Sequence, residues 1–202
     1  MASNADNLEV EVKFFVPDLN AIREQLVQLG VEVTKPRIFE QNVRYDTMNE
    51  ELFQEWKLLR LRQDNVVTVT FKGEPQEEVT SEARVREELE VQVSDFETMA
   101  MIFERIGFYP VQSYEKYRET FIWGNVEVVL DELPYGDFVE LEGEETALKT
   151  AVSQLGLDWQ KRILTNYLGL MQQLKDKHDL PFTDLTFANF EDLTISAADI
   201  LP

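Results

Sequence analysis

The sequence contains no cysteine, a single histidine and no long run of apolar residues. Without cysteine the chain can form neither disulfides nor thiolate metal sites, and His178 alone cannot build a histidine-based zinc site or a Ser-His catalytic triad. A bound metal must therefore have oxygen ligands, which favours magnesium, manganese or calcium. No stretch approaches the roughly 20 apolar residues of a membrane helix, and the N-terminus lacks a basic segment followed by an apolar run. We therefore expect a cytoplasmic location.

Positive charge is also scarce, with 19 Lys and Arg against 39 Asp and Glu and a formal net charge of −20. Long-range repulsion argues against binding to duplex nucleic acid or to an anionic membrane, so a polyanion would have to be captured locally. The 202 residues, 44% of them hydrophobic, suffice for one globular domain with a full core. We expect this domain at residues 1–175, as a monomer or homodimer, followed by an acidic C-terminal extension at residues 176–202.

Alternation of apolar and polar residues with a period of two predicts about eight strands. The expected strands are 8–16, 39–46, 58–63, 66–72, 83–93, 114–123, 126–130 and 137–142. Gly124-Asn125 predicts a tight hairpin between the sixth and seventh strands, and Pro134-Tyr135-Gly136 predicts another turn soon after. The second half of the chain is therefore expected to be a meander.

Two stretches of the sequence repeat a strand followed by a helix. Asp18 is the predicted N-cap of a helix that stops at Gly30, and Asp95 caps a second one that stops at Gly107. Cap and glycine are twelve positions apart in both copies. This duplication favours an α+β fold with two helices around one mostly antiparallel sheet system. After a further helix expected at about residues 164–177, four apolar residues of the tail could dock on the domain: Phe182, Leu185, Phe187 and Phe190.

Sorting the strands by parity places charged residues on one face and apolar residues on the other. The acids of the charged face are Glu9, Glu11, Glu40, Asp46, Glu88, Glu90, Glu127, Asp131, Glu140 and Glu142. Its bases are Lys13, Arg44, Arg60, Arg62, Lys72, Arg84, Arg86, Lys116 and Arg118. The apolar face, including Leu89 and Val91, must then be covered by the two amphipathic helices.

A half-buried antiparallel sheet ordinarily has one solvated polar face, and for any single strand this interpretation is the simpler one. Across eight strands, the repeated charge-x-charge pattern favours a shared ligand. Eight strands can close around side chains or a small ligand, so we expect an eight-stranded antiparallel β-barrel tunnel with a charged lumen and helices packed on the outside. Crowded cations need an anion and clustered carboxylates need cations, and a metal-bound polyphosphate satisfies both.

The pentapeptide EVEVK at residues 9–13 resembles the ExExK signature of the CYTH superfamily, the triphosphate tunnel metalloenzymes. This superfamily includes class IV adenylyl cyclases, thiamine triphosphatases and inorganic triphosphatases. Further motifs of the family follow in order: VRYDT, LRLR, TVTFKG, VREELEV, EKYRETF and VVLDELPYGDFVELEG. Several ordered motifs are more specific than one pentapeptide, and the match spans roughly residues 7–170.

The resemblance implies a small-molecule triphosphate substrate and Mg²⁺ or Mn²⁺ as the cofactor. The metal ligands that it implies are Glu9, Glu11, Asp131, Glu140 and Glu142. The phosphate-binding residues that it implies are Lys13, Arg60, Arg62, Lys72, Arg86 and Arg118. Lys116 matches a lysine that is thought to activate the attacking water in some small triphosphatases of the family, and a phosphate clamp is an equally good interpretation. In ILTNYLGLM, which resembles the family's closing helix, Asn166 replaces a serine.

Three functions remain open from the sequence: metal-dependent hydrolysis of a triphosphate, class IV adenylate cyclase activity on ATP, and non-catalytic binding of polyphosphate or nucleotide. Tunnel cations serve the first two alike, because both reactions need charge neutralised along three phosphates. Hydrolysis is favoured because it needs only phosphate, metal and water, and no convincing adenine-recognition set is visible. Trp56 could stack a ring at the tunnel mouth, although a core or rim position is the simpler interpretation.

Overall fold

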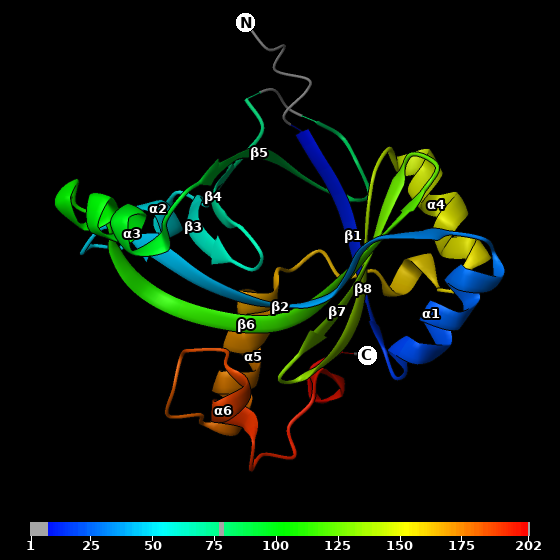
Figure 1. The fold of residues 1–202 in the computed structure, drawn as a ribbon. Helices are drawn as coiled ribbons and strands as arrows, with labels where there is room; N and C mark the ends of the chain where they lie inside the picture. The colour runs from blue at the N-terminus through cyan, green and yellow to red at the C-terminus, as the bar shows by residue number, and fades with distance from the viewer. Residues whose placement is uncertain (1–7, 77–78, 202) are drawn as a thin grey trace, which may run out of the picture.

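The computed structural model describes residues 8–76 and 79–201 (Figure 1). Its strands are β1 (Leu8–Val16), β2 (Glu32–Asp46), β3 (Leu58–Gln63), β4 (Val67–Gly73), β5 (Arg84–Val93), β6 (Tyr109–Trp123), β7 (Val126–Leu133) and β8 (Gly136–Glu142). Its helices are α1 (Leu19–Gln28), α2 (Glu51–Gln54), α3 (Phe96–Arg105), α4 (Glu145–Gln154), α5 (Tyr167–His178) and α6 (Phe187–Phe190), with 3-10 helices η2 (Trp159–Lys161) and η3 (Ala197–Asp199). All eight predicted strands are present, but β2 begins at Glu32 rather than residue 39, and β6 at Tyr109 rather than residue 114.

The strands form a closed antiparallel ring in the order β1-β5-β4-β3-β2-β6-β7-β8, with β8 paired back to β1. In Figure 1, β7, β8 and β1 form one side of the ring, β3, β4 and β5 the opposite side, and the long strands β2 and β6 connect them. The β2–β6 pairing shifts register at Val33, Lys35 and Arg44, and such bulges bend long strands around a barrel. The prediction of an eight-stranded antiparallel tunnel is confirmed.

The two predicted strand-helix units are confirmed. The side chain of Asp18 accepts hydrogen bonds from two backbone amides of α1, and that of Asp95 accepts one from α3. Gly30 and Gly107 both have positive φ, at 74° and 97°, which lets each chain leave its helix through the left-handed region. The strands of the two units, β1 and β5, pair with each other in the ring.

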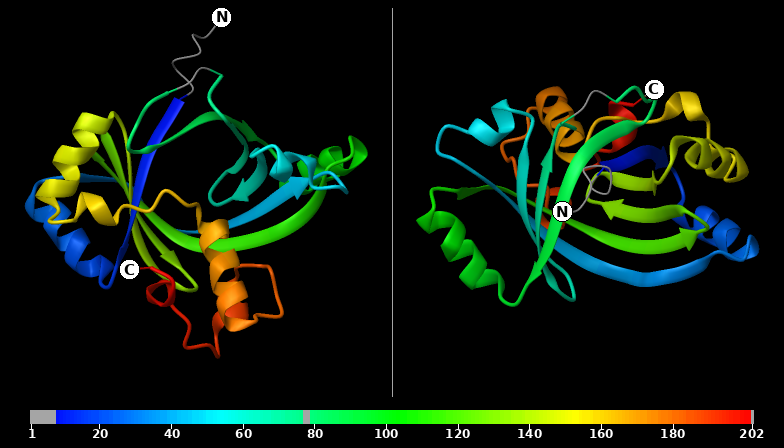
Figure 2. Two further views of the ribbon diagram at one scale, coloured as in Figure 1. Left: turned by 180° about the vertical axis from the view of Figure 1, so that it is seen from behind. Right: turned by 90° about the horizontal axis from the view of Figure 1, so that it is seen from above.

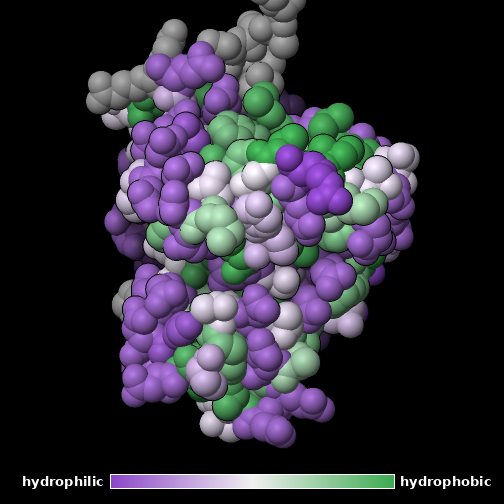
Figure 3. Space-filling view, turned by 90° about the vertical axis from the view of Figure 1, so that its left-hand side faces the viewer, coloured by the Kyte–Doolittle hydropathy of each residue, from purple (hydrophilic) through white to green (hydrophobic). Residues whose placement is uncertain are grey.

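The hydrophobic core lies outside the ring in three clusters: under α1 and α4, under α3, and around α5 with the tail. Figure 2 shows these helices outside the ring from two further sides. The prediction that two helices cover the apolar face is wrong, because α4 and α5 are also needed and Leu89 and Val91 stay 45% and 59% exposed. A ten-residue helix is only about 15 Å long, so two such helices are too short to cover the outer face of all eight strands. On the side that carries α2 and α3, hydrophobic residues reach the surface among hydrophilic ones (Figure 3).

The tail docks on the first half of β6, which β7 leaves free because β7 pairs only with Tyr117–Trp123. The backbone amide of Leu185 donates to the Ser113 carbonyl (2.9 Å), and its carbonyl accepts from the Glu115 amide (2.8 Å). Leu185 and Phe190 are buried, as the docking prediction requires. The predicted domain boundary at residue 175 falls inside α5 and stays a prediction.

Within residues 8–76 and 79–201, no helix has the length and apolar character needed to cross a membrane.

Candidate functional site

The lumen of the ring holds a cavity of about 330 Å³. Residues from all eight strands line it, because the period of two turns every second side chain inward. Its nine cations are Lys13, Lys35, Arg60, Arg62, Lys72, Arg84, Arg86, Lys116 and Arg118. Its nine acids are Glu9, Glu11, Glu40, Asp64, Glu88, Glu90, Glu127, Glu140 and Glu142. Nine of the 19 cations of a strongly acidic chain therefore surround one enclosed space.

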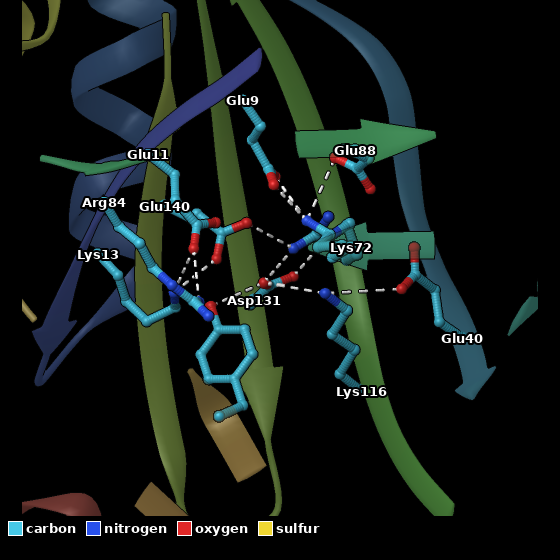
Figure 4. Close-up of polar contacts among 12 residues, drawn as sticks. Glu9, Glu11, Lys13, Glu40, Lys72, Arg84, Glu88, Lys116, Asp131 and Glu140 are labelled. Atoms are coloured by element: carbon cyan, nitrogen blue, oxygen red, sulfur yellow. Dashed lines mark hydrogen bonds and ion pairs between the residues drawn. The ribbon is translucent and has the colours of Figure 1, made fainter. Parts of the chain in front are cut away.

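Eleven of the twelve predicted site residues line this cavity, and only Asp131 does not. Figure 4 shows side chains from β1, β2, β4, β5, β6, β7 and β8 pointing toward one another. Two arginines of the predicted charged face, Arg44 and Arg84, are not among the phosphate-binding residues that the resemblance implies. Arg84 lines the cavity and Arg44 does not. Asp46, assigned to the charged face, instead accepts hydrogen bonds from the backbone amides of Thr47, Leu52 and Phe53 and so holds the start of α2.

Asp131 is completely buried in the wall and holds the cations in place. Its oxygens accept from both prongs of the Arg118 guanidinium (2.7 and 2.5 Å), from Lys116 Nζ (3.1 Å) and from the Tyr167 hydroxyl (2.8 Å). Burial acts to lower the pKa of Arg118, but the attraction of Asp131, with that of Glu40 and Glu140, outweighs it and raises that pKa well above its ordinary value. A metal ion could reach Asp131 only by displacing these partners.

A group of carboxylates lies along β1, β5, β7 and β8. Lys72 Nζ lies 2.5 and 2.7 Å from the two Glu9 oxygens and 3.2 Å from Glu88. Burial raises the pKa of Glu9 to about 8, with Lys72 opposing the rise and neighbouring carboxylates adding to it. Burial, followed by repulsion from Glu127, raises the pKa of Glu142 to about 7. In both cases burial is the largest cause, so the neighbouring cations do not fully replace the hydration that these carboxylates have lost.

The carboxylates fit a hard divalent cation by their chemistry, because Mg²⁺ and Mn²⁺ prefer carboxylate oxygens. Glu11 and Glu142 lie opposite each other in the β1–β8 register, and Glu9 lies two residues before Glu11 on the same face. Lys72 on Glu9 and Arg84 on Glu11 (2.9 Å) supply the neutralising charge in this arrangement. In the part of the chain that the structure describes, no three acidic or imidazole groups converge closely enough to hold a metal ion as they stand.

The remaining cations are held in two different ways. Lys13 Nζ lies 3.0 Å from Glu140 and 4.6 Å from the centre of the Tyr167 ring, both inside the lumen. Arg86 instead donates to two backbone carbonyls, those of Gly73 (2.9 Å) and Trp56 (2.6 Å). Both sets of contacts fix the direction in which the cation points.

Glu40 and Arg60 illustrate how the burial of charge is offset. Burial acts to raise the pKa of Glu40, but Lys116, Arg118 and other lumen cations outweigh it and lower that pKa to about 2. Arg60 donates to Thr70, to the Tyr114 hydroxyl (3.2 Å) and to Glu90 (3.2 Å). Burial acts to lower the pKa of Arg60, but Tyr114, followed by Glu90 and Glu88, outweighs it and raises that pKa above the ordinary value.

The start of α5 closes part of the wall, with Asn166, Tyr167 and Leu168 lining the cavity. The Asn166 side chain accepts a hydrogen bond from the Gly169 amide (2.7 Å), so it caps the helix where the family pattern has serine. The segment before it is anchored by the Ile163 amide, which donates to the Lys13 carbonyl (2.7 Å).

The family model of the CYTH domain matches residues 7–171. The chain belongs to the CYTH family. It is 32% identical over 137 residues to the candidate adenylate cyclase MJ0240 of Methanocaldococcus jannaschii, covering 67% of this chain and 76% of that protein.

Solved structures share the fold of this CYTH protein. A candidate adenylate cyclase from Vibrio parahaemolyticus has a TM-score of 0.69 at 24% identity, covering 80% of this chain and 95% of the other. The candidate adenylyl cyclase HpAC1 from Hippeastrum, whose structure is described as revealing a dominant triphosphatase activity, has a TM-score of 0.54 at 16% identity, covering 78% and 91%. At these identities the structures show a common fold.

Several lining residues of this CYTH protein were missed from its sequence. They are Lys35, Ile38, Leu58, Asp64, Tyr114, Thr120, Asn166, Tyr167 and Leu168. The bulges in β2 hide Lys35, because each shift of register breaks the period of two. Asn166 and Tyr167 lie on a helix that reaches the lumen from outside the ring, so no strand pattern could reveal them. The sequence favoured a core or rim position for Trp56, and its 73% exposure excludes the core.

Proposed function

We propose that this CYTH protein hydrolyses a triphosphate in a divalent-metal-dependent reaction inside the tunnel. The substrate is inorganic tripolyphosphate or an organic triphosphate, including nucleoside triphosphates. One observation carries the proposal: nine cations and nine acids line an enclosed cavity of about 330 Å³ in a chain with a net charge of −20. A triphosphate with a bound metal ion is a ligand of matching size, in which negative and positive charge alternate.

The cations of the tunnel bind and orient the phosphates. Arginines supply planar pairs of donors for phosphate oxygens, while lysines supply point charges. Arg118 and Lys116 are positioned by Asp131, whose oxygens they share. Positioning and charge neutralisation account for most of the catalysis of phosphoryl transfer, which requires little covalent chemistry from the protein.

The carboxylates Glu9, Glu11 and Glu142, with Glu140 beside them, would hold Mg²⁺ or Mn²⁺. When bound, such an ion supplies charge neutralisation on the phosphates and lowers the pKa of a coordinated water. In the hydrolysis, a water oxygen forms a bond to the terminal phosphorus while the bond to the bridging oxygen breaks, which releases orthophosphate and a diphosphate. Lys116, near the middle of β6, is either the base for this water or a clamp on the phosphate.

Adenylate cyclase activity is the second candidate, favoured by the names of MJ0240 and of the Vibrio protein. In that reaction the ribose 3′-hydroxyl oxygen attacks the α-phosphorus, which yields cyclic AMP and pyrophosphate. The dominant triphosphatase activity stated for HpAC1 supports placing hydrolysis first.

The test is to incubate the pure protein with tripolyphosphate, ATP or thiamine triphosphate, each with Mg²⁺, with Mn²⁺ or with EDTA. We expect orthophosphate, formed only with a divalent ion. Arg60→Ala, inside the tunnel, should abolish most turnover, whereas Arg37→Ala, on the outer surface, should not. Formation of cyclic AMP and pyrophosphate would show that the protein is a cyclase rather than a hydrolase. Tight binding without turnover would show that it is a binding module.

A further inference from the structure

A second cavity of about 560 Å³ opens off the tunnel, and we call it the side cavity. It lies between the start of β2, the β3–β4 hairpin and the end of β5. The residues that it shares with the tunnel are Lys35, Ile38, Arg62, Asp64 and Glu90. Its volume falls within the roughly 300–1,000 Å³ that is usual for small-molecule sites.

The lining of the side cavity differs sharply in charge from that of the tunnel. Each of its charged residues also lines the tunnel, so all of them lie at the junction. The residues that belong to the side cavity alone are neutral: Thr34, Pro36, Asn65, Val66, Thr68, Val91 and Gln92. A ligand that extends from the tunnel into the side cavity therefore passes from a charged to an uncharged environment.

The two cations at the junction have only weak partners. Arg62 lies 3.7 Å from Asp64 and 3.8 Å from Glu90, and it donates to the Thr68 hydroxyl at 3.5 Å. Its Nε is buried without a hydrogen-bond partner. Lys35 forms no ion pair within residues 8–76 and 79–201. By contrast, Arg118 lies within 2.7 Å of both Asp131 oxygens. A phosphate at the point where the two cavities meet could therefore pair with Lys35 and replace the long contacts of Arg62.

A buried amide beside the junction also lacks a partner. Asn42 lies opposite Arg62 in the β2–β3 register and on the lumen side of β2. It is completely buried, and neither its Oδ1 nor its Nδ2 has a hydrogen-bond partner in the described part of the chain. Asn42 lines neither cavity, so it bears on the junction only through the position of its strand neighbour Arg62.

The neutral lining offers both hydrogen bonds and apolar contacts. The side-chain amides of Asn65 and Gln92 form no hydrogen bond with any described residue, and both residues are exposed. Val66 and Val91 are also exposed, at 41% and 59%, although both are apolar. Amides beside branched apolar side chains suit a group with polar edges and apolar faces.

We propose that the side cavity binds an uncharged organic group attached to the triphosphate, with a nucleoside as the probe of choice. The phosphate next to this group then lies at Lys35 and Arg62, and the terminal phosphate lies further along the tunnel toward Lys116. The inference rests on the proposed function of the tunnel and narrows its substrate class to organic triphosphates. Trp56 precedes β3 and therefore lies at the opposite end of the ring, where a stacked ring would be bound instead if the orientation were reversed.

The absence of cysteine from the chain allows a direct test with single thiols. Asn65→Cys and Gln92→Cys report on the side cavity, Trp56→Cys reports on the opposite rim, and Gln41→Cys is a matched exposed control on the outer face of β2. Each variant is labelled with a maleimide in the presence of Mg²⁺ and the ATP analogue with imido groups at both the α,β and the β,γ bridge, or with the inorganic triphosphate that carries imido groups at both bridges (imidotriphosphate), so that neither hydrolysis nor cyclisation consumes the ligand. Circular dichroism checks that each variant is folded.

At ten times its Kd, the ATP analogue should slow labelling of Asn65→Cys and Gln92→Cys about tenfold, as expected from simple occupancy. Imidotriphosphate should change these rates by less than about twofold, because it lacks the organic group. In a parallel titration, the double variant Asn65→Ala/Gln92→Ala should bind the ATP analogue about tenfold more weakly and imidotriphosphate as tightly as before, since only the organic group loses its hydrogen bonds. Gln41→Cys should be unaffected throughout.

Equal protection by both ligands would overturn the inference, as would protection of Trp56→Cys in place of the side-cavity thiols. Binding of imidotriphosphate alone would also overturn it while leaving the proposed function of the tunnel intact. If neither ligand bound the unmodified protein, the proposed function itself would fail.

Discussion

Arg118 and Asp131 lie opposite each other in the register of β6 and β7 and form a two-pronged ion pair, with Nε–Oδ1 at 2.7 Å and Nη2–Oδ2 at 2.5 Å. Asp131 has no exposed surface. The chain repeats this geometry on its outside, where both Arg37 nitrogens lie 2.7 Å from the oxygens of Glu132, but there the side chains are 45% and 29% exposed. The two pairs separate the effect of burial from that of geometry.

Asp131→Asn should destabilise the protein by about 3–5 kcal/mol, because it removes the buried carboxylate that Arg118 and Lys116 share and leaves them only the more distant Glu140 (3.1 Å) and Glu40 (3.6 Å). Glu132→Gln, the matched surface change, should cost less than about 1 kcal/mol, since water screens the exposed pair. Urea unfolding followed by tryptophan fluorescence measures both values. Equal losses would show that burial does not govern the strength of these pairs.

Lys116→Arg should retain turnover within about tenfold, whereas Lys116→Ala should lose about a hundredfold or more. The reason is that Lys116 Nζ lies between two carboxylates, 3.1 Å from Asp131 and 3.6 Å from Glu40, which is a suitable position for a clamping cation. The measurement is the initial rate of orthophosphate release as a function of pH. A comparable loss in both variants, together with a changed pH profile, would instead assign Lys116 as the base.

Glu142→Gln should stabilise the protein at high pH and leave it unchanged near pH 4.5. The folded protein raises the pKa of Glu142 from 4.5 to about 7, so between these values it keeps a proton that the unfolded chain has lost. Stability therefore falls as pH rises through this window, and glutamine removes the loss. The gain should reach about 1–3 kcal/mol above pH 7 in the absence of divalent ions.

Glu40→Gln should show the opposite sign and so serves as the comparison. Because the folded protein lowers the pKa of Glu40 to about 2, this carboxylate contributes stability above pH 4.5 that is lost as the pH falls toward 2. The variant should therefore be less stable than the parent at neutral pH and should approach it in acid. Urea midpoints collected from pH 3 to pH 9 compare both variants, and a difference that did not change with pH would contradict these assignments.

Leu185→Ala should destabilise the protein by about 2–5 kcal/mol, because Leu185 is completely buried where the tail docks on β6. Leu193→Ala, in the same tail but 37% exposed, should cost much less. Thermal unfolding detects the difference. Two equal and small effects would show that the tail does not contribute to the stability of the domain.

The sequence predicted the strands, the two capped helices and sixteen residues of the tunnel lining, because these depend on local patterns. Alternation with a period of two decides which side chains share a face of a strand, and Asp18 and Asp95 carry their capping function wherever their helices lie. Asp131 was also placed on the charged face. Its position in the strand alternation does not show, however, that its oxygens already accept hydrogen bonds from Arg118, Lys116 and Tyr167.

Only the tertiary structure decided how the faces meet. Closure of the ring pairs β8 with β1, the bulges of β2 bring Lys35 inside, and α5 delivers Tyr167 to Asp131 from 36 positions away in the chain. These relationships depend on the register of all eight strand pairings around the ring, and no local sequence pattern determines all of these registers together. The residue types determined the chemistry that is available, while the closed ring determined which charges oppose one another and where the neutral side cavity opens.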